Sequence, residues 1–289
     1  PGGWATQRPS ATWLVYPSAS GQNGTRLHVA PINHAHERNS RSRIVPRLNR
    51  ARMVMQKSSS MELAIVMPVY NEATAIRGVV EEWLPVLGGI RGVLLVMDDG
   101  STDGTSEILR ELQQRHADRM EVIRHANRGH GQTVLEGYRT ACDRGVEFVF
   151  QIDSDGQCDP KFFPEVWRLR KDFDVIYGRR VVRQDGWKRK VATWVVRLAV
   201  FCSTGVICED ANTPYRLMRA ERLPDVVKRI PPTFDLANIA LAVELKRARW
   251  RHASVPIVFR PRLAGESKVP FSRFVFKAFE LVGDLVRRG

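Results

Sequence analysis

Residues 151–160, "QIDSDGQCDP", place acidic and amide side chains directly after an apolar run. Asp153 and Asp155 are spaced by one residue, and Gln157 follows at the same spacing. Mg²⁺ and Mn²⁺ prefer such oxygen ligands and commonly bridge one or two carboxylates to a diphosphate. Two acids after a strand can also simply form a turn, and for an isolated Asp-x-Asp the turn is the better interpretation. The motifs elsewhere in the chain favour the metal site.

The chain has no glycine-rich phosphate loop where a nucleotide-binding fold would place one. Its first apolar run ends in "MPVYNEATA", which matches neither GxGxxG nor GxxxxGK[ST]. A ligand that carries phosphates must then be held in another way, and a cation gripped by carboxylates is the usual substitute.

Apolar runs in the sequence predict the strands and helices that would position these acids. Strand-type runs alternate with helix-length segments, which predicts an α/β fold with a mostly parallel sheet covered by helices on both faces. Ligands of such sheets bind at the carboxyl ends of the strands, where the unusual polar residues of this chain stand. The runs are "LAIVM" (63–67), "VLLVM" (93–97), "MEVIR" (120–124) and "EFVFQI" (147–152).

Capping residues predict where the helices begin and end. Asn71 can cap a helix that opens with Glu72, and Gly88 and Gly89 end it. The second helix runs to about residue 116, with caps offered by Ser101, Thr102 and Asp103. The loop "HANRGHGQ" (125–132) precedes a third helix, which continues through residue 141.

Composition favours one large domain, preceded by a basic segment. The 289 residues are 43% hydrophobic and 26% charged, with a formal net charge of +14. Residues 1–60 hold nine Arg or Lys against the single acid Glu37 and show no apolar periodicity, which predicts a disordered basic leader. A transit peptide, a mis-assigned start and a fragment are the alternatives for this leader. The folded domain is expected over 61–270.

The four cysteines form no CxxC pair and have no histidine at zinc spacing, which favours reduced thiols in a cytosolic setting. No stretch reaches the length of a clean membrane span. The nearest, 191–208, is interrupted by Arg197, so a core helix or an interfacial helix is expected there.

Seven motifs occur in one order and together resemble family 2 glycosyltransferases with the GT-A fold. The resemblance extends from Leu63 to Lys268 and is strongest to the dolichol-phosphate mannose synthase group of polyprenyl-phosphate glycosyltransferases. The motifs are "VMPVYNE" (66–72), "VMDDGSTDGT" (96–105), "NRGHGQ" (127–132), "QIDSDGQCDP" (151–160), "VIYGRR" (175–180), "DANTPYRLMRA" (210–220) and "VPIVFRPRLAGESK" (255–268).

The resemblance implies a nucleotide-sugar donor, a GDP-sugar or a UDP-sugar, bound with Mg²⁺ or Mn²⁺. Asp153 and Asp155 match the residues that hold the metal and diphosphate, with Gln157 as the adjoining ligand. Gly129 and Gly131 would let the backbone approach the donor closely. The positions matching base, ribose and further donor contacts are Pro68, Tyr70, Glu72, Asp98, Asp99, Ser154 and Lys268.

The same resemblance implies an inverting transfer to a polyprenyl phosphate. An acceptor phosphate is already an anion, so it needs cationic positioning rather than a general base. The candidate cations are Arg179, Arg180, Arg262 and Lys268. A hydroxyl acceptor is the alternative, and it would require a carboxylate base, for which Asp210 and Asp235 are the candidates.

One departure from the family pattern concerns the sugar-facing surface. The polyprenyl group commonly shows Gly-Gly-Phe-Arg where this chain has "NTPYR" (212–216), which leaves the identity of the sugar open.

Residues 271–289 carry apolar side chains at helical spacing and predict an amphipathic C-terminal helix. Such a helix can pack on the core or lie in the plane of a membrane surface. The expected location is therefore cytoplasmic, peripheral at the cytoplasmic face of a membrane. A nucleic-acid partner through the basic leader is ranked last, because the leader lacks interleaved aromatic residues.

Overall fold

The computed structural model describes residues 61–181, 201, 212–231 and 237–262. Several predicted features lie outside these residues and stay predictions. They are the leader 1–60, the apolar segment 191–208 except Phe201, the amphipathic helix 271–289, and the candidate residues Asp210, Asp235 and Lys268.

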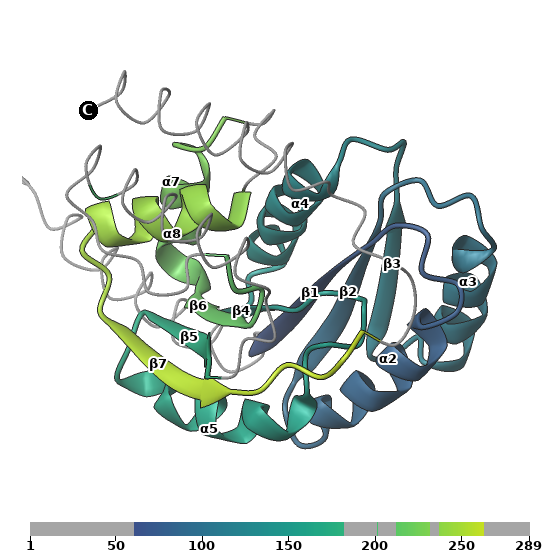
Figure 1. Ribbon diagram of the computed structural model, residues 1–289, viewed down its shortest axis with the longest axis horizontal. Helices are drawn as coiled ribbons and strands as arrows, with labels where there is room; N and C mark the ends of the chain where they lie inside the picture. Colours follow the sequence, from purple (N-terminus) through teal and green to yellow (C-terminus); the bar gives the residue numbers. More distant parts are fainter. Residues whose placement is uncertain (1–60, 182–200, 202–211, 232–236, 263–289) are drawn as a thin grey trace, which may run out of the picture. The chain divides into compact units, whose positions relative to one another are not determined.

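A seven-stranded sheet runs through the described residues in the order β3-β2-β1-β4-β6-β5-β7 (Figure 1). Strand β6 is antiparallel to both of its neighbours, and the other strand pairs are parallel, so the predicted mostly parallel sheet is confirmed. The strands are β1 (Leu63–Val69), β2 (Gly92–Asp98), β3 (Met120–Arg124), β4 (Phe148–Gln151), β5 (Val175–Arg180), β6 (Arg216–Arg219) and β7 (His252–Ile257).

Helices cover both faces of this sheet, as predicted. Strand β1 is buried along its whole length, and its alternate side chains enter two different cores. One core packs against α4, α7 and α8, and the other packs against α2, α3 and α5 (Figure 1). The α-helices are α2 (Ile76–Trp83), α3 (Thr105–Arg115), α4 (His130–Asp143), α5 (Phe163–Arg168), α7 (Leu223–Val227) and α8 (Ala237–Arg247).

Short 3₁₀ turns extend several helices. The turn η1 (Leu84–Leu87) continues α2 to the predicted stop at Gly88. The others are η2 (Pro160–Phe162), η3 (Leu169–Lys171) and η4 (Ala220–Arg222).

The predicted start of the first helix at Glu72 was wrong, because α2 begins at Ile76. Asn71 does not cap it: this residue has a φ of 54°, and its side-chain oxygen accepts a hydrogen bond from the Thr102 backbone N–H. The Asn71 side-chain amide therefore bonds a neighbouring loop instead of capping the helix. Of the caps proposed for the second helix, Asp103 accepts a hydrogen bond from the N–H of Thr105, the first residue of α3.

The third helix also starts differently from the prediction. Helix α4 begins at His130, inside the segment that was predicted to be a loop, and ends two residues beyond the predicted end.

Strand direction gathers the site at one edge of the sheet. Because β6 is antiparallel, its first residue, Arg216, pairs with Gln151 near the end of β4 and with Tyr177 of β5. Strand β7 is parallel to β5, and its last residue, Ile257, pairs with Arg180. The segment after β7 therefore leaves the sheet at the same edge as the loops that follow β4 and β5.

Candidate active site

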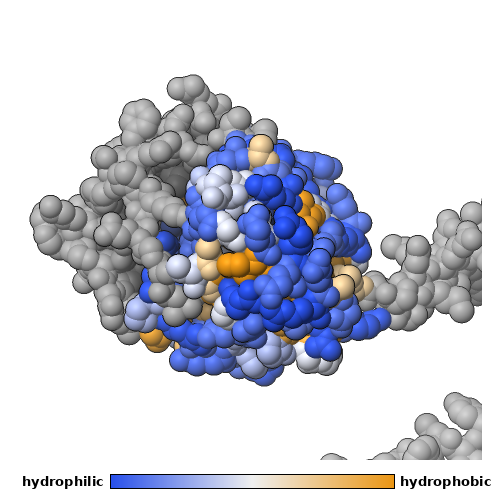
Figure 2. Space-filling view, turned by 90° about the vertical axis from the view of Figure 1, so that its right-hand side faces the viewer, coloured by the Kyte–Doolittle hydropathy of each residue, from blue (hydrophilic) through white to orange (hydrophobic). Residues whose placement is uncertain are grey.

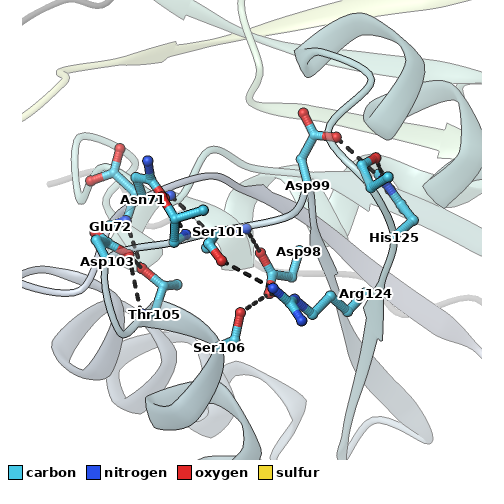
Figure 3. Close-up of polar contacts among 12 residues, drawn as sticks. Asn71, Glu72, Asp98, Asp99, Ser101, Asp103, Thr105, Ser106, Arg124 and His125 are labelled. Atoms are coloured by element: carbon cyan, nitrogen blue, oxygen red, sulfur yellow. Dashed lines mark hydrogen bonds and ion pairs between the residues drawn. The ribbon is translucent and has the colours of Figure 1, made fainter.

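Two loops at the carboxyl ends of β1 and β2 are locked together by hydrogen bonds (Figure 3). The Asn71 N–H donates to the Ser101 hydroxyl at 3.0 Å, and the Glu72 N–H donates to the Thr105 hydroxyl at 2.9 Å. These hydrogen bonds hold Tyr70 and Glu72 in place, two residues that were predicted to contact the nucleotide-sugar donor. Tyr70 has 38% of its surface exposed at the edge of the sheet. The predicted donor residue Pro68 is buried in β1.

Asp98, at the end of β2, is fully buried at 0% exposure. One carboxylate oxygen accepts the Ser101 N–H at 3.0 Å. The other oxygen accepts the Ser106 hydroxyl and lies 3.4 Å from Arg124 Nε (Figure 3). A buried charge is retained only where such donors compensate for lost water. Asp98 therefore orders the loop from β2 to α3.

Asp99 holds the loop that precedes α4. Its two carboxylate oxygens accept the backbone N–H groups of Arg128 and Gly129, at 2.7 and 3.0 Å. His125 lies beside it, with Nδ1 3.4 Å from an Asp99 oxygen and 2.9 Å from the Ala126 carbonyl (Figure 3). Because both neighbours of Nδ1 are acceptors, that ring nitrogen carries a proton.

A cavity of about 460 Å³ opens beside this loop. Gly100 permits the close approach of the two loops there: its φ is 72°, and a Cβ atom would come within 2.8 Å of the Asn127 backbone nitrogen. The cavity is lined by Gly100, Arg124, His125, Ala126 and Asn127.

Asp153 follows β4 and has an unsatisfied oxygen. Its side chain is 30% exposed, yet its Oδ1 atom is buried with no hydrogen-bond partner. Burial raises the pKa of Asp153 to about 6, with the positive charge of His130 acting against the rise and the negative charge of Asp155 adding to it. His130 Nε2 lies 4.0 Å from this oxygen. An oriented, incompletely compensated carboxylate is suited to receive a cation.

Asp155 lies on the same turn and is differently satisfied. It is 6% exposed, and its Oδ1 atom accepts the Gln157 N–H at 3.1 Å. Its Oδ2 atom accepts a charged hydrogen bond from Arg262 Nη2 at 2.9 Å. Ser154, between the two acids, is buried as well. The Arg262 guanidinium, a cation of the protein itself, thus contacts this turn.

The segment after β7, residues 258–262, is tied to the same turn. The Arg260 N–H donates to the Gln157 carbonyl at 3.0 Å, and Gln157 Nε2 donates back to the Arg260 carbonyl at 3.3 Å. The Arg260 guanidinium contacts Asp159 at 2.8 Å and Glu82 at 2.7 Å. Burial opposes ionisation of Asp159, but hydrogen bonds from Arg260 and Lys161 outweigh it and lower its pKa to about 2.

The residues of the Asp153–Gln157 turn fit a metal bound together with a diphosphate. Among the described residues, no three or more His, Cys, Asp or Glu side chains gather as a metal cluster. Mg²⁺ does not need one, since it usually takes one or two carboxylates and fills its shell with water and substrate phosphates. The buried Asp153 oxygen, which has no hydrogen-bond partner, is the observation that favours this arrangement.

Two arginines end β5 next to this turn. Arg179 is exposed, and the Arg180 guanidinium stacks over Phe259 at 5.3 Å from the ring centroid. The positive charges of Arg262 and Arg180 both counteract the rise in the Asp153 pKa, which places them in its electrostatic neighbourhood. The carboxyl ends of β4, β5 and β7 therefore combine acids with cations.

A buried polar cluster that sequence reasoning missed supports the end of β4. Arg216 is fully buried and donates to the Thr213 and Asn238 carbonyls at 3.3 and 3.2 Å. The Tyr138 hydroxyl donates to the Gln151 side chain. Arg216 stands in the "NTPYR" segment, but its burial follows from strand pairing, which no local pattern shows.

The structure thus divides the predicted site residues into two groups. One surrounds the ends of β1 and β2 and contains Tyr70, Glu72, Asp98 and Asp99. The other surrounds the ends of β4, β5 and β7 and contains Asp153, Asp155, Gln157, Arg179, Arg180 and Arg262. His125 and His130, which lie beside Asp99 and Asp153, were not among the predicted site residues, although the motif "NRGHGQ" contains His130.

Comparison with known proteins agrees with the family that the motifs indicate. The sequence profile of Glycosyl transferase family 2 matches residues 64–230, more than half of the chain. An undecaprenyl-phosphate 4-deoxy-4-formamido-L-arabinose transferase of Edwardsiella ictaluri is 26% identical over 224 residues, which cover 76% of this chain and 66% of that protein. An undecaprenyl-phosphate mannosyltransferase of Micrococcus luteus is 27% identical over 221 residues, which cover 72% of this chain and 88% of that protein. The chain spans slightly less than two thirds of the length of the first of these relatives.

A solved structure shares the fold. Glucosyl-3-phosphoglycerate synthase from Mycobacterium tuberculosis, in complex with Mn²⁺, UDP-glucose and phosphoglyceric acid, superposes with a TM-score of 0.57. It is 16% identical, and the match covers 81% of each chain. The likeness confirms the predicted GT-A fold.

Proposed function

Because the chain belongs to glycosyl transferase family 2, we propose that it transfers a sugar from a nucleoside-diphosphate sugar to a polyprenyl phosphate. The observation that carries the proposal is the pair of carboxylates of Asp153 and Asp155, one with a buried oxygen that has no hydrogen-bond partner, near the arginines that end β5. Such a site can take a dianionic leaving group on one side and an anionic acceptor on the other. The names of the two undecaprenyl-phosphate transferases support this choice of acceptor.

On this proposal, Asp153 and Asp155 would hold Mg²⁺ or Mn²⁺, with Gln157 adjoining. A bound divalent cation would offset the negative charge that grows on the departing nucleoside diphosphate. The locked loops after β1 and β2 would hold the nucleoside, with Tyr70 and Glu72 at the exposed edge and the Asp99-bound loop beside them.

The acceptor phosphate would be positioned by cations. A guanidinium pairs with two phosphate oxygens at once, and the exposed Arg179 and its neighbour Arg180 stand at the end of β5. Because a phosphate oxygen is already ionised, attack on the anomeric carbon needs no general base. Inversion at that carbon follows from a single displacement.

The lipid acceptor implies contact with a membrane surface. Val181 and Val258 are exposed apolar residues directly after β5 and β7, next to the arginines. The face shown in Figure 2, on the α3 side of the described residues, is mostly hydrophilic, with only small apolar areas. The described helices include none that is long and apolar enough to cross a membrane. We therefore place the lipid-facing surface at the ends of β5 and β7.

The test is a transfer assay on the full chain. Undecaprenyl phosphate, Mg²⁺ and a panel of UDP- and GDP-sugars are supplied one at a time, and the released nucleoside diphosphate and the glycolipid are measured. We expect one donor to give both products, with Asp155→Asn inactive and Asp172→Asn, an exposed acid outside the site, active. Transfer to a soluble hydroxyl acceptor, with none to the lipid phosphate, would overturn the proposed acceptor.

A further inference from the structure

Arg262 occupies one of the two proposed metal ligands. Its Nη2 atom donates to Asp155 Oδ2 at 2.9 Å, while the neighbouring Asp153 keeps a buried oxygen without a hydrogen-bond partner. The two acids of one turn are therefore in different states. Asp153 has an oxygen that could accept a cation, whereas Asp155 is already paired with the Arg262 guanidinium.

The contact depends on a segment anchored elsewhere. Residues 258–262 are fixed to the turn by the paired bonds between Arg260 and Gln157 and by the ion pairs of Arg260 with Asp159 and Glu82. These bonds do not involve Arg262 itself. Movement of the Arg262 side chain away from Asp155 would consequently leave these anchors of the segment in place.

The Arg262–Asp155 pair is also accessible enough to be exchanged. The Arg262 side chain is 31% exposed, whereas the Asp155 side chain is only 9% exposed. A partly solvated arginine pays little to change partners, and its fork fits phosphate oxygens as well as carboxylate oxygens. A divalent cation at Asp155 would both compete for Oδ2 and repel the guanidinium.

We propose that Arg262 is a displaceable counter-cation: it neutralises Asp155 while the site is empty, and moves to phosphate oxygens when a metal–nucleotide complex binds. The inference rests on the proposed function, since it assumes a metal-bound diphosphate at Asp153 and Asp155. Arg262 then couples arrival of the donor to the placement of a positive charge over the phosphates. It acts as a positioning residue at both stages.

The proposal predicts effects of opposite sign for one substitution. Arg262→Gln removes the competing charge, so Mn²⁺ alone should bind about twofold to fivefold more tightly, the range of a partly exposed ion pair. Mn²⁺ with UDP or with GDP should bind about tenfold more weakly, because a charged hydrogen bond to phosphate is lost. A loss of folding would weaken both, so the opposite signs separate the proposed role from a structural one.

Binding is measured on the full chain by electron paramagnetic resonance of free Mn²⁺, first alone and then with UDP and GDP tested separately. Arg262→Lys keeps the charge without the fork and should fall between the wild type and Arg262→Gln in nucleotide binding. Arg251→Gln is the matched control, because Arg251 also pairs with a carboxylate, that of Asp174. This pair lies at the amino-terminal ends of β5 and β7, opposite the candidate site. Its Mn²⁺ and nucleotide affinities should equal those of the wild type.

A second readout protects the test against an unstable variant. If Arg262→Gln lowers the melting temperature, added Mn²⁺ should raise it more in the variant than in the wild type, since ligand binding stabilises in proportion to affinity. Unchanged or weakened binding of Mn²⁺ alone in Arg262→Gln would overturn the inference. That result would leave the proposed function intact, because sugar transfer is measured separately.

Discussion

Two pairs of acids stand at the carboxyl ends of parallel strands, and they are used differently. Asp98 and Asp99, after β2, have every carboxylate oxygen bonded to donors of the protein. Asp153 and Asp155, after β4, include one buried oxygen without a hydrogen-bond partner and one that accepts a hydrogen bond from the side chain of Arg262. The two pairs thus differ in how completely the protein bonds their carboxylate oxygens, rather than in residue type or place in the sheet.

The largest effect should come from neutralising the pair after β4. We expect Asp153→Asn and Asp155→Asn each to lower turnover by about 100-fold to 1,000-fold, the usual cost of removing a group that stabilises transition-state charge. The unfolding free energy should change little, because the bonds between Arg260 and Gln157 keep the segment after β7 fixed to this turn. Turnover with a metal and a lipid phosphate is the measurement. An Asp153→Asn variant with wild-type, metal-dependent turnover would break the comparison.

Neutralising the pair after β2 should act on stability instead. Asp98→Asn places an amide N–H₂ against the donors that surround a buried carboxylate, so we expect a loss of roughly 1–3 kcal/mol in the free energy of unfolding. Urea unfolding checks this, with Asp118→Asn, an exposed acid before β3, as the control. Unchanged stability in Asp98→Asn would show that its bonds do not organise the loop.

The cations beside the second pair give a smaller and more specific effect. Arg179→Ala should raise the KM for polyprenyl phosphate by about tenfold, the contribution of one charged hydrogen bond, and leave donor binding nearly unchanged. Arg119→Ala removes an exposed arginine at the amino-terminal end of β3. It should alter neither the KM for polyprenyl phosphate nor the affinity for the nucleotide-sugar donor. Equal losses in donor and acceptor binding would place Arg179 at the diphosphate rather than at the acceptor.

The smallest effect concerns an acid far from the site. Asp174 accepts hydrogen bonds from the Arg251 side chain and backbone N–H, which outweigh the effect of burial and lower its pKa. Its stabilising contribution is therefore present above the ordinary Asp pKa of about 4 and is lost as the pH falls below it. Wild-type stability should drop more than that of Asp174→Asn between about pH 4 and pH 2. The difference should stay near 1 kcal/mol or less, because Arg251 is largely exposed.

Much of the fold was predictable from local pattern. The runs at 63–67, 93–97, 120–124 and 147–152 became β1 to β4. Strands β1, β2 and β4 are buried along nearly all of their length and are therefore largely apolar, whereas the partly buried β3 also carries Glu121 and Arg124. The antiparallel insertion of β6 between β4 and β5 was not predictable, since a four-residue strand carries too little pattern. The predicted helix start after Asn71 was wrong because the Asn71 side-chain amide bonds a loop 31 residues away in sequence.

The position of the candidate acids could be predicted from the sequence, but their hydrogen-bond partners could not. The acids 153 and 155 stand out by type, spacing and position after a strand. That Asp98 is buried among three donors, and that Arg262 reaches Asp155, depends on contacts between distant parts of the chain. Neither has a signature in the residues on either side.

The most direct test of the difference between the two pairs is to locate the metal. Crystals of the protein grown with Mn²⁺ and with UDP or GDP would be measured at the manganese absorption edge, so that anomalous scattering marks the ion. We expect one strong peak in coordination contact with Asp153 and Asp155, and none at Asp98 or Asp99. A peak at the acids after β2, with none at those after β4, would contradict the account.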